Sequence, residues 1–185
     1  MDLVPFDELN KFEDGLSIHF DAEGKIASKK DAEDIIDEMF ELLLLSTAHG
    51  MEAVNADLGS DISLSADDAI GIVDTRIEGK TWRDRVMGYY ESGGDIYDIR
   101  RIAETESHRD ANAAAFETAL RAGATEKIWN TMLDDRVRDT HQYLEGVSAP
   151  MDGSFYSFKG GETLYPGQWG IAEEDINCRC YLTFR

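Results

Sequence analysis

The sequence has no long hydrophobic segment and few prolines or cysteines. No apolar run is longer than the four leucines Leu42–Leu45, whereas a membrane-spanning helix needs about 20 apolar residues. The N-terminus has no basic patch followed by an apolar stretch, so we expect no secretory signal and no membrane association. Three prolines and no low-complexity tract argue against disorder. We therefore expect a folded protein that is made in a cytoplasm.

Basic residues are also scarce, and the formal net charge is -20. Residues 1–80 hold twenty acidic and six basic side chains, whereas residues 81–185 hold eighteen and twelve. Because nucleic-acid binding depends on Lys and Arg contacts to phosphate, we expect no direct nucleic-acid binding by residues 1–80. An acidic surface suits either a basic protein partner or simple solubility, and the sequence leaves both open.

Helical periodicity covers most of the sequence before residue 123. Apolar residues recur at helical spacing from Asp31 to Leu58, with Gly50 as an expected break. Ser65 and Thr81 are suitable N-terminal caps for later helices. In contrast, Leu16–Phe20 alternates as a strand does, and His19 would lie within that strand. We predict helices over residues 31–58, 65–77, 82–91 and 95–122, and a short helix or extended arm over residues 3–13.

Glu106 and Arg109 lie three positions apart in the longest of these helices, so they can pair on one face. If this pair is buried, it must belong to a larger polar network to be tolerated. The spacing therefore indicates that the helix supports a polar site.

The region after Gly123 carries the most chemically specific residues, including both cysteines. We predict a strand over residues 126–132, a short helix to Tyr143, small antiparallel strands over 147–165 and a final strand over 177–184. On the short helix, Asp134, Arg138 and His141 would share one face. The final strand would direct Cys178 and Cys180 to the same side. The predicted fold is α+β, with a helical N-terminal part followed by a compact unit with a small antiparallel sheet.

Motifs spread over residues 81–185 form an ordered pattern. They are Arg101-Ile102-Ala103, Thr105-Glu106 and Asn112, followed by Trp129, Asp134, Arg138, His141, Gly146, Phe155, Pro166-Gly167 and Asn177-Cys178-Arg179-Cys180. In this order and spacing they resemble the phage Mu F-like minor head protein family, also called phage head morphogenesis proteins. We therefore divide the chain into an acidic helical segment, residues 1–80, and a Mu F-like minor head domain, residues 81–185, which we expect to fold without the first segment.

The resemblance implies a minor head protein of a tailed phage or prophage, made in the bacterial cytoplasm and located in the inner head of the virion. It implies portal and capsid proteins as partners. It leaves a role in DNA packaging or ejection, and homo-oligomer formation, open. Domains of this family also occur fused to toxin domains carried in phage particles.

Three interpretations of the polar residues compete. In the first, Glu106, Asp134, Arg138, His141 and Asn177 form a buried hydrogen-bond network that is purely structural. In the second, His141, Cys178 and Cys180 bind zinc, with Asp134 as a fourth ligand and the protein acting as an adaptor. In the third, the protein is a phage-borne enzyme or toxin-like domain. The candidate catalytic residues are then His141, as general base, with Arg138, Asp134 and Glu106.

No Gly-rich phosphate loop and no recognisable nucleophile motif accompany these residues. The sequence therefore favours the structural network, no cofactor and a non-enzymatic minor head protein. The aromatic residues Phe155, Tyr165 and Trp169 are expected in the core, and Pro166-Gly167 is expected in a turn.

Overall fold

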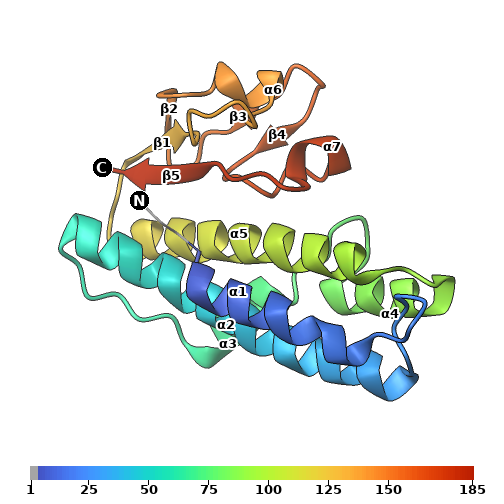
Figure 1. Ribbon diagram of the computed structural model, residues 1–185. Helices are drawn as coiled ribbons and strands as arrows, with labels where there is room; N and C mark the ends of the chain where they lie inside the picture. Colours follow the sequence, from blue (N-terminus) through green and yellow to red (C-terminus); the bar gives the residue numbers. More distant parts are fainter. Residues whose placement is uncertain (1–3) are drawn as a thin grey trace.

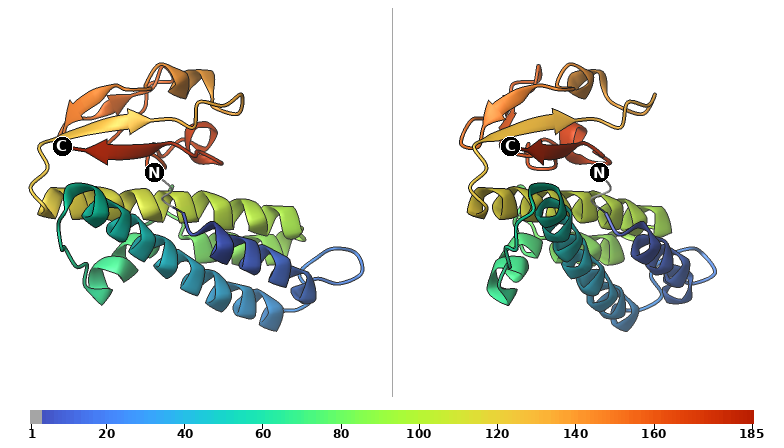
Figure 2. Two further views of the ribbon diagram at one scale, coloured as in Figure 1. Left: turned by 60° about the vertical axis from the view of Figure 1, so that its left-hand side comes forward. Right: turned by 90° about the vertical axis from the view of Figure 1, so that its left-hand side faces the viewer.

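The computed structural model describes residues 4–185 and shows two layers joined by one long helix. Helix α5 (Ile96–Arg121) lies between the N-terminal helices and a smaller unit of strands and turns (Figures 1 and 2). The protein is α+β, as predicted, with the helices first and a small antiparallel sheet in the C-terminal unit. None of the helices in residues 4–185 is long and apolar enough to cross a membrane.

The helical layer is capped as the sequence predicts. The Ser65 and Thr81 side chains each form a capping box with the residue three positions later, and Gly59 and Gly93 end their helices in the left-handed conformation. Besides α5, the layer contains α1 (Phe6–Gly15), the 3-10 helix η1 (Leu16–His19), α2 (Lys29–Leu58), α3 (Ala66–Val73) and α4 (Trp82–Ser92). The arm or helix expected over residues 3–13 is therefore a helix, and Leu3 lies outside the described residues.

The prediction of a strand over Leu16–Phe20 is wrong. These residues form η1, and only Phe20 makes a β-bridge, with Ile26. The helical turn lets Leu16 enter the core and places the buried His19 ring 3.3 Å from carboxylate oxygens of both Asp31 and Glu38 on α2. These contacts to α2 outweigh the local alternation, which favoured a strand.

Gly50 does not break α2, contrary to expectation. It lies where α2 crosses α5, and a Cβ atom at Gly50 would lie 2.2 Å from the backbone oxygen of Ala111. Small residues on α5, among them Ala111, Ala114 and Ala115, are fully buried. Glycine and alanine thus allow the two helices to approach closely, which explains why a helix-weakening residue stands inside α2.

The C-terminal unit contains two small antiparallel sheets. The larger has the order β2-β1-β5, with β1 in the centre and Trp129 of β1 opposite Leu182 of β5. The smaller pairs β3 with β4. The elements are β1 (Glu126–Asn130), α6 (Asp139–Gln142), β2 (Ser148–Pro150), β3 (Phe155–Tyr156), β4 (Glu162–Thr163), α7 (Ala172–Asp175) and β5 (Tyr181–Phe184).

One hydrophobic core joins residues 1–80 to residues 81–185. Leu43 and Val54 of α2, Ile99 and Ala115 of α5, and Trp129 of β1 belong to the same buried cluster. The proposed division at residue 80 stays a prediction, but it does not coincide with a gap in the packing.

Candidate functional site

Three side chains of the C-terminal unit converge on one point. His141 lies in α6, and Cys178 and Cys180 lie in the segment between α7 and β5. The Nδ1 atom of His141 is 3.6 Å from Sγ of Cys178 and 3.5 Å from Sγ of Cys180. The three side chains are buried, at 1%, 4% and 4% exposure. The structure therefore brings together the three residues considered as metal ligands.

Helix α5 holds the cysteine segment in place. The backbone N–H of Asn177 donates to Oγ1 of Thr105 at 3.2 Å, and Nδ2 of Asn112 donates to the carbonyl oxygen of Cys180 at 3.1 Å. Asn177 adopts the left-handed conformation, with φ of 57°, which Asn tolerates better than most residues. The Thr105, Asn112 and Asn177 motif residues thus position the two cysteines from opposite ends of the segment.

Glu174 of α7 supports the other side of the His141 ring. Its Oε2 atom lies 3.0 Å from Nε2 of His141 and accepts a hydrogen bond from Thr140, while its Oε1 atom accepts one from Ser157. Burial alone would raise the pKa of Glu174, but these hydrogen bonds and the neighbouring His141 lower the pKa below its ordinary value. An anchored carboxylate at Nε2 keeps Nδ1 directed at the cysteines. Glu174 could not be recognised from the sequence, because nothing there distinguishes it from its acidic neighbours Glu173 and Asp175.

Aromatic rings enclose this cluster. The His141 ring stacks on Trp169, with centroids 5.9 Å apart, and meets Trp129 edge-on at 5.7 Å. Phe155 packs edge-on against Trp129 at 5.0 Å. The core positions predicted for Phe155 and Trp169 are confirmed, and Pro166-Gly167 forms the predicted turn, with φ of 87° at Gly167. The rings exclude bulk water from the cysteine and histidine side chains.

The pKa values of the two cysteines are shifted from their ordinary value in different directions. A hydrogen bond from Cys180 and the facing His141 ring hold the pKa of Cys178 well below its usual range, although burial opposes this. The pKa of Cys180 is raised, first because of its hydrogen bond to Cys178 and then because of burial. The pKa values of the two cysteines thus shift in opposite directions.

Asp134 and Arg138 do not share a helix face with His141, so that prediction is wrong. Helix α6 begins only at Asp139, after Asp134 has formed a turn by accepting the backbone N–H of Arg136. Asp134 accepts two bonds from Nη2 of Arg179, at 2.6 and 2.8 Å. Arg138 donates to the carbonyl oxygen of Ile176.

Glu106 belongs to a second buried cluster in the helical layer. It contacts Arg109 at the predicted spacing and also Arg85 of α4, while Arg109 binds Asp110 at 2.8 Å. Burial raises the pKa of Asp110 to about 7, although Arg109 opposes this. The Glu106–Arg109 pair is thus buried within a network, as its spacing suggested. However, the five residues proposed for one network lie in separate clusters according to the contacts of residues 4–185.

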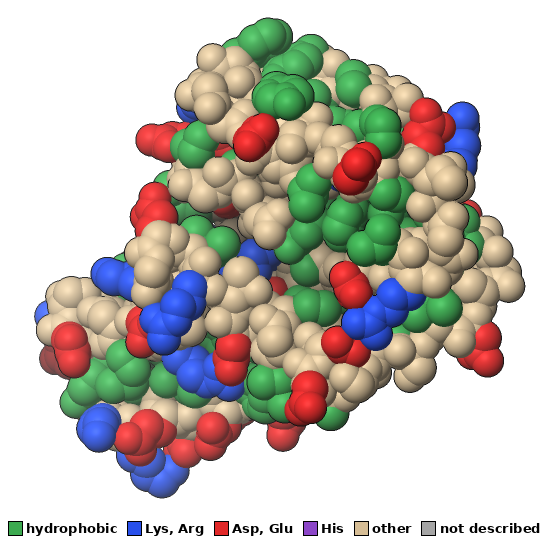
Figure 3. All heavy atoms as spheres, turned by 180° about the vertical axis from the view of Figure 1, so that it is seen from behind, with side chains coloured by type: hydrophobic (Ala, Val, Ile, Leu, Met, Phe, Trp, Pro, Cys, Tyr) green, Lys and Arg blue, Asp and Glu red, His purple; other side chains and the backbone are tan. Residues whose placement is uncertain are grey.

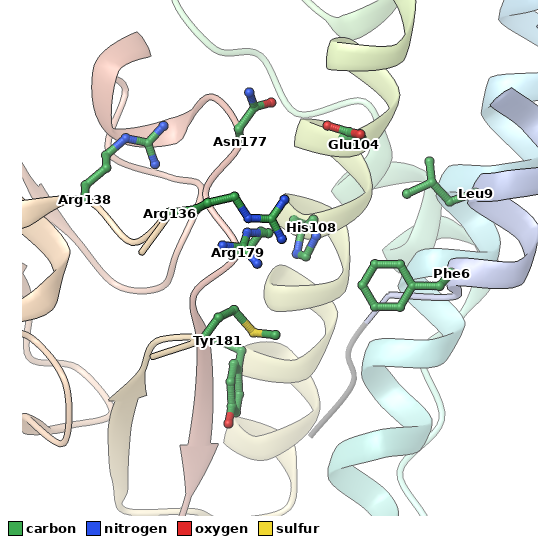
Figure 4. Close-up of a pocket in the computed structure, with 10 residues that line it drawn as sticks. Phe6, Leu9, Glu104, His108, Arg136, Arg138, Asn177, Arg179 and Tyr181 are labelled. Atoms are coloured by element: carbon green, nitrogen blue, oxygen red, sulfur yellow. The ribbon is translucent and has the colours of Figure 1, made fainter. Parts of the chain in front are cut away.

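A groove separates α1 and α5 from the C-terminal unit. Its volume is about 860 Å³, and Figure 4 shows Arg136 and Arg179 approaching His108 of α5 across it. Burial, with a smaller effect of Arg179, lowers the pKa of His108 to about 4, so His108 is neutral at neutral pH. The groove is lined by Phe6, Leu9, Glu104, His108, Met132, Arg136, Arg138, Asn177, Arg179 and Tyr181. It therefore combines apolar side chains with three guanidinium groups in a strongly acidic protein.

The family match covers the residues that form the His141 cluster and most of the groove. The model of the family described as Phage Mu protein F like protein matches residues 79–183, more than half of the chain. The chain belongs to this family, and the resemblance predicted from its motifs is confirmed.

Two curated proteins show the similarity in more detail. Minor head protein GP7 of Bacillus phage SPP1 is 39% identical over 88 residues, which are 46% of this chain and 29% of that protein. The NAD(+)--arginine ADP-ribosyltransferase EFV of Enterococcus faecalis (strain ATCC 700802 / V583) is 32% identical over 114 residues, which are 59% of this chain and 23% of that protein. The chain spans less than a third of the length of either relative. No solved structure matches the chain significantly.

Proposed function

We propose that this chain acts as a minor head protein of a tailed phage or prophage, in the inner head of the virion, and that it binds portal or capsid proteins during head assembly. The observation that carries this proposal is the family match over residues 79–183, together with the similarity to a minor head protein. A role in DNA packaging or ejection would follow from a position beside the portal. Because the chain covers only part of its relatives, its partners and position belong to the proposal.

The groove supports a docking role. Its guanidinium groups suit carboxylates, and Phe6, Leu9 and Tyr181 supply apolar contact area. On the face seen in Figure 3, charged side chains gather over the helical layer, and hydrophobic side chains are more frequent over the C-terminal unit. We therefore expect the partner to contribute an acidic, partly apolar segment to the groove.

Arg136 and Arg185 provide a matched test. Both side chains are 74% exposed, and within residues 4–185 each has one long contact to a carboxylate, at 3.8 and 3.6 Å. Only Arg136 lines the groove. We expect R136E to weaken capture of the purified portal or capsid protein of the same phage about tenfold or more, most strongly at low salt, because like charges then face each other. The control R185E should bind as the wild type does.

Equal binding by the two variants would exclude the groove as the docking site. Failure of the wild-type chain to bind either purified partner, or to be found in virions, would contradict the proposed function itself.

An enzyme or toxin-like domain is the alternative. The geometry adds no specific support for it, because His141 is almost fully buried and Asp134 and Glu106 contact other residues. The ADP-ribosyltransferase name belongs to a relative of which this chain covers 23%.

A further inference from the structure

We propose that His141, Cys178 and Cys180 bind one zinc ion, with a water molecule as the fourth ligand. One imidazole and two thiolates are ligands that favour zinc over magnesium or calcium. In residues 4–185 these three donor atoms lie within 4.8 Å of one another, and no fourth His, Cys, Asp or Glu joins their group. Asp134, considered earlier as a fourth ligand, binds Arg179 instead.

The two nitrogen–sulfur distances match those of a tetrahedral site. With Zn–S distances of about 2.3 Å and a Zn–N distance of about 2.0–2.1 Å, nitrogen and sulfur ligands are separated by roughly 3.5–3.6 Å. The two measured separations from Nδ1 are 3.5 and 3.6 Å. A neutral imidazole nitrogen has one lone pair and accepts one proton. Two sulfur atoms equally close to one nitrogen, at separations that suit zinc ligands, are consistent with a shared metal ion.

The surroundings of His141 match those of a metal-bound histidine. Such rings usually have a carboxylate or carbonyl at the second nitrogen, which fixes their orientation. The carboxylate of Glu174 lies 3.0 Å from this second nitrogen of His141, is fully buried and is itself held by Ser157 and Thr140. Burying a carboxylate costs free energy because the charge loses its contact with water. A cation bound on the far side of the His141 ring would stabilise the buried Glu174 carboxylate.

Space for the fourth ligand lies beside the cluster. A cavity of about 10 Å³ borders His141 and Cys180, close to the minimum of roughly 10–15 Å³ that holds one water molecule. Asn177, Arg138 and Met132 also border it. A single water can therefore complete the coordination without a further protein ligand.

Metal analysis and cobalt substitution test the site directly. The full chain, purified without a histidine tag, should contain about one zinc per chain by elemental analysis. After zinc is exchanged for Co²⁺, a sulfur-to-cobalt charge-transfer band should appear in the near ultraviolet. C178S and C180S should each weaken that band and lose zinc, whereas H108A removes a histidine outside the site and should keep one zinc.

Glu174→Gln provides a second variant that retains the three ligands. We expect its zinc affinity, measured by competition with a chelating dye, to fall about 10- to 100-fold while saturating zinc still gives one equivalent. The proposal is overturned if wild-type protein incubated with Zn²⁺ and then desalted holds less than about a tenth of an equivalent, or if the Co²⁺ form lacks the charge-transfer band. These readouts need no folded cysteine variant and do not depend on portal or capsid binding.

Discussion

At the residue scale, Glu106 is a buried carboxylate held between two arginines. It is 1% exposed and contacts Arg109 of its own helix and Arg85 of α4. Removing one member of such a cluster leaves the others charged and buried without compensation, which costs far more than the loss of a surface ion pair. Glu106 therefore contributes to stability mainly by neutralising its neighbours.

We predict that E106A lowers the free energy of unfolding by about 3–5 kcal/mol. E117A is the matched control, because Glu117 also lies on α5 and pairs with an arginine, Arg121, but at the surface. The control should change stability little, since exposed pairs are weak. Urea unfolding followed by circular dichroism measures both. Equal losses in the two variants would show that Glu106 is no more important than a surface carboxylate.

Residue types and spacing predicted part of the candidate site. The i,i+3 spacing predicted the Glu106–Arg109 pair. A period of two predicted both cysteines on one side of the chain, although the strand from which this was argued begins only at Tyr181. Arg85 and Glu174 could not be found in this way, because each reaches its partner across a gap of more than twenty residues. Such contacts depend on how helices and turns pack, which no local pattern encodes.

At the scale of secondary-structure elements, helices α2 and α5 pack closely against each other at the point where they cross. Gly50 has no side chain and the alanines of α5 have only a methyl group, so the two backbones can approach closely. Close packing of this kind tolerates little added volume.

We predict that Gly50→Ala destabilises the protein by about 1–3 kcal/mol, because the new methyl group meets a backbone oxygen that cannot move without shifting a helix. The exposed Gly88 of α4 has no heavy atom within 4 Å of its added Cβ. Gly88→Ala should therefore stabilise the protein by roughly 0.5–1 kcal/mol through helix propensity. Thermal unfolding of both variants checks this, and a stabilising Gly50→Ala would contradict the close crossing.

The helices that carry capping residues and sustained periodicity were predictable, whereas the exact bounds of the shorter elements were not. Ser65 and Thr81 marked two helix starts correctly. The four-residue helices α6 and α7 are too short for a hydrophobic period to be recognised. The final strand was predicted to begin at residue 177, but it begins only at Tyr181.

At the scale of the whole molecule, the long helix α5 is shared by two layers. One side packs on α2 and the other on β5 (Figure 1). The sequence-based boundary at residue 80 therefore divides a common core, although it corresponds closely to the start of the family match at residue 79.

The shared core changes our expectation for a truncated protein. We predict that residues 81–185 alone are strongly destabilised, because removing α2 exposes the apolar side of α5 to water. Adding residues 1–80 as a separate chain should restore helical signal and a cooperative thermal transition, as measured by circular dichroism. A truncated chain that melts cooperatively near the temperature of the full chain would instead support an independent domain.

The order of strands along the chain constrains when the larger sheet can form. Strand β1 is central, but its partners are β2 and β5, and β5 follows it by about fifty residues. During synthesis the helices α1 to α5 leave the ribosome first and can begin to pack, since chains fold from the N-terminus as they emerge. One edge of β1 then stays unpaired until Tyr181–Phe184 arrives. An exposed edge invites pairing with other chains, so a chain whose synthesis ends before residue 181 would be a helical body with an open, aggregation-prone strand.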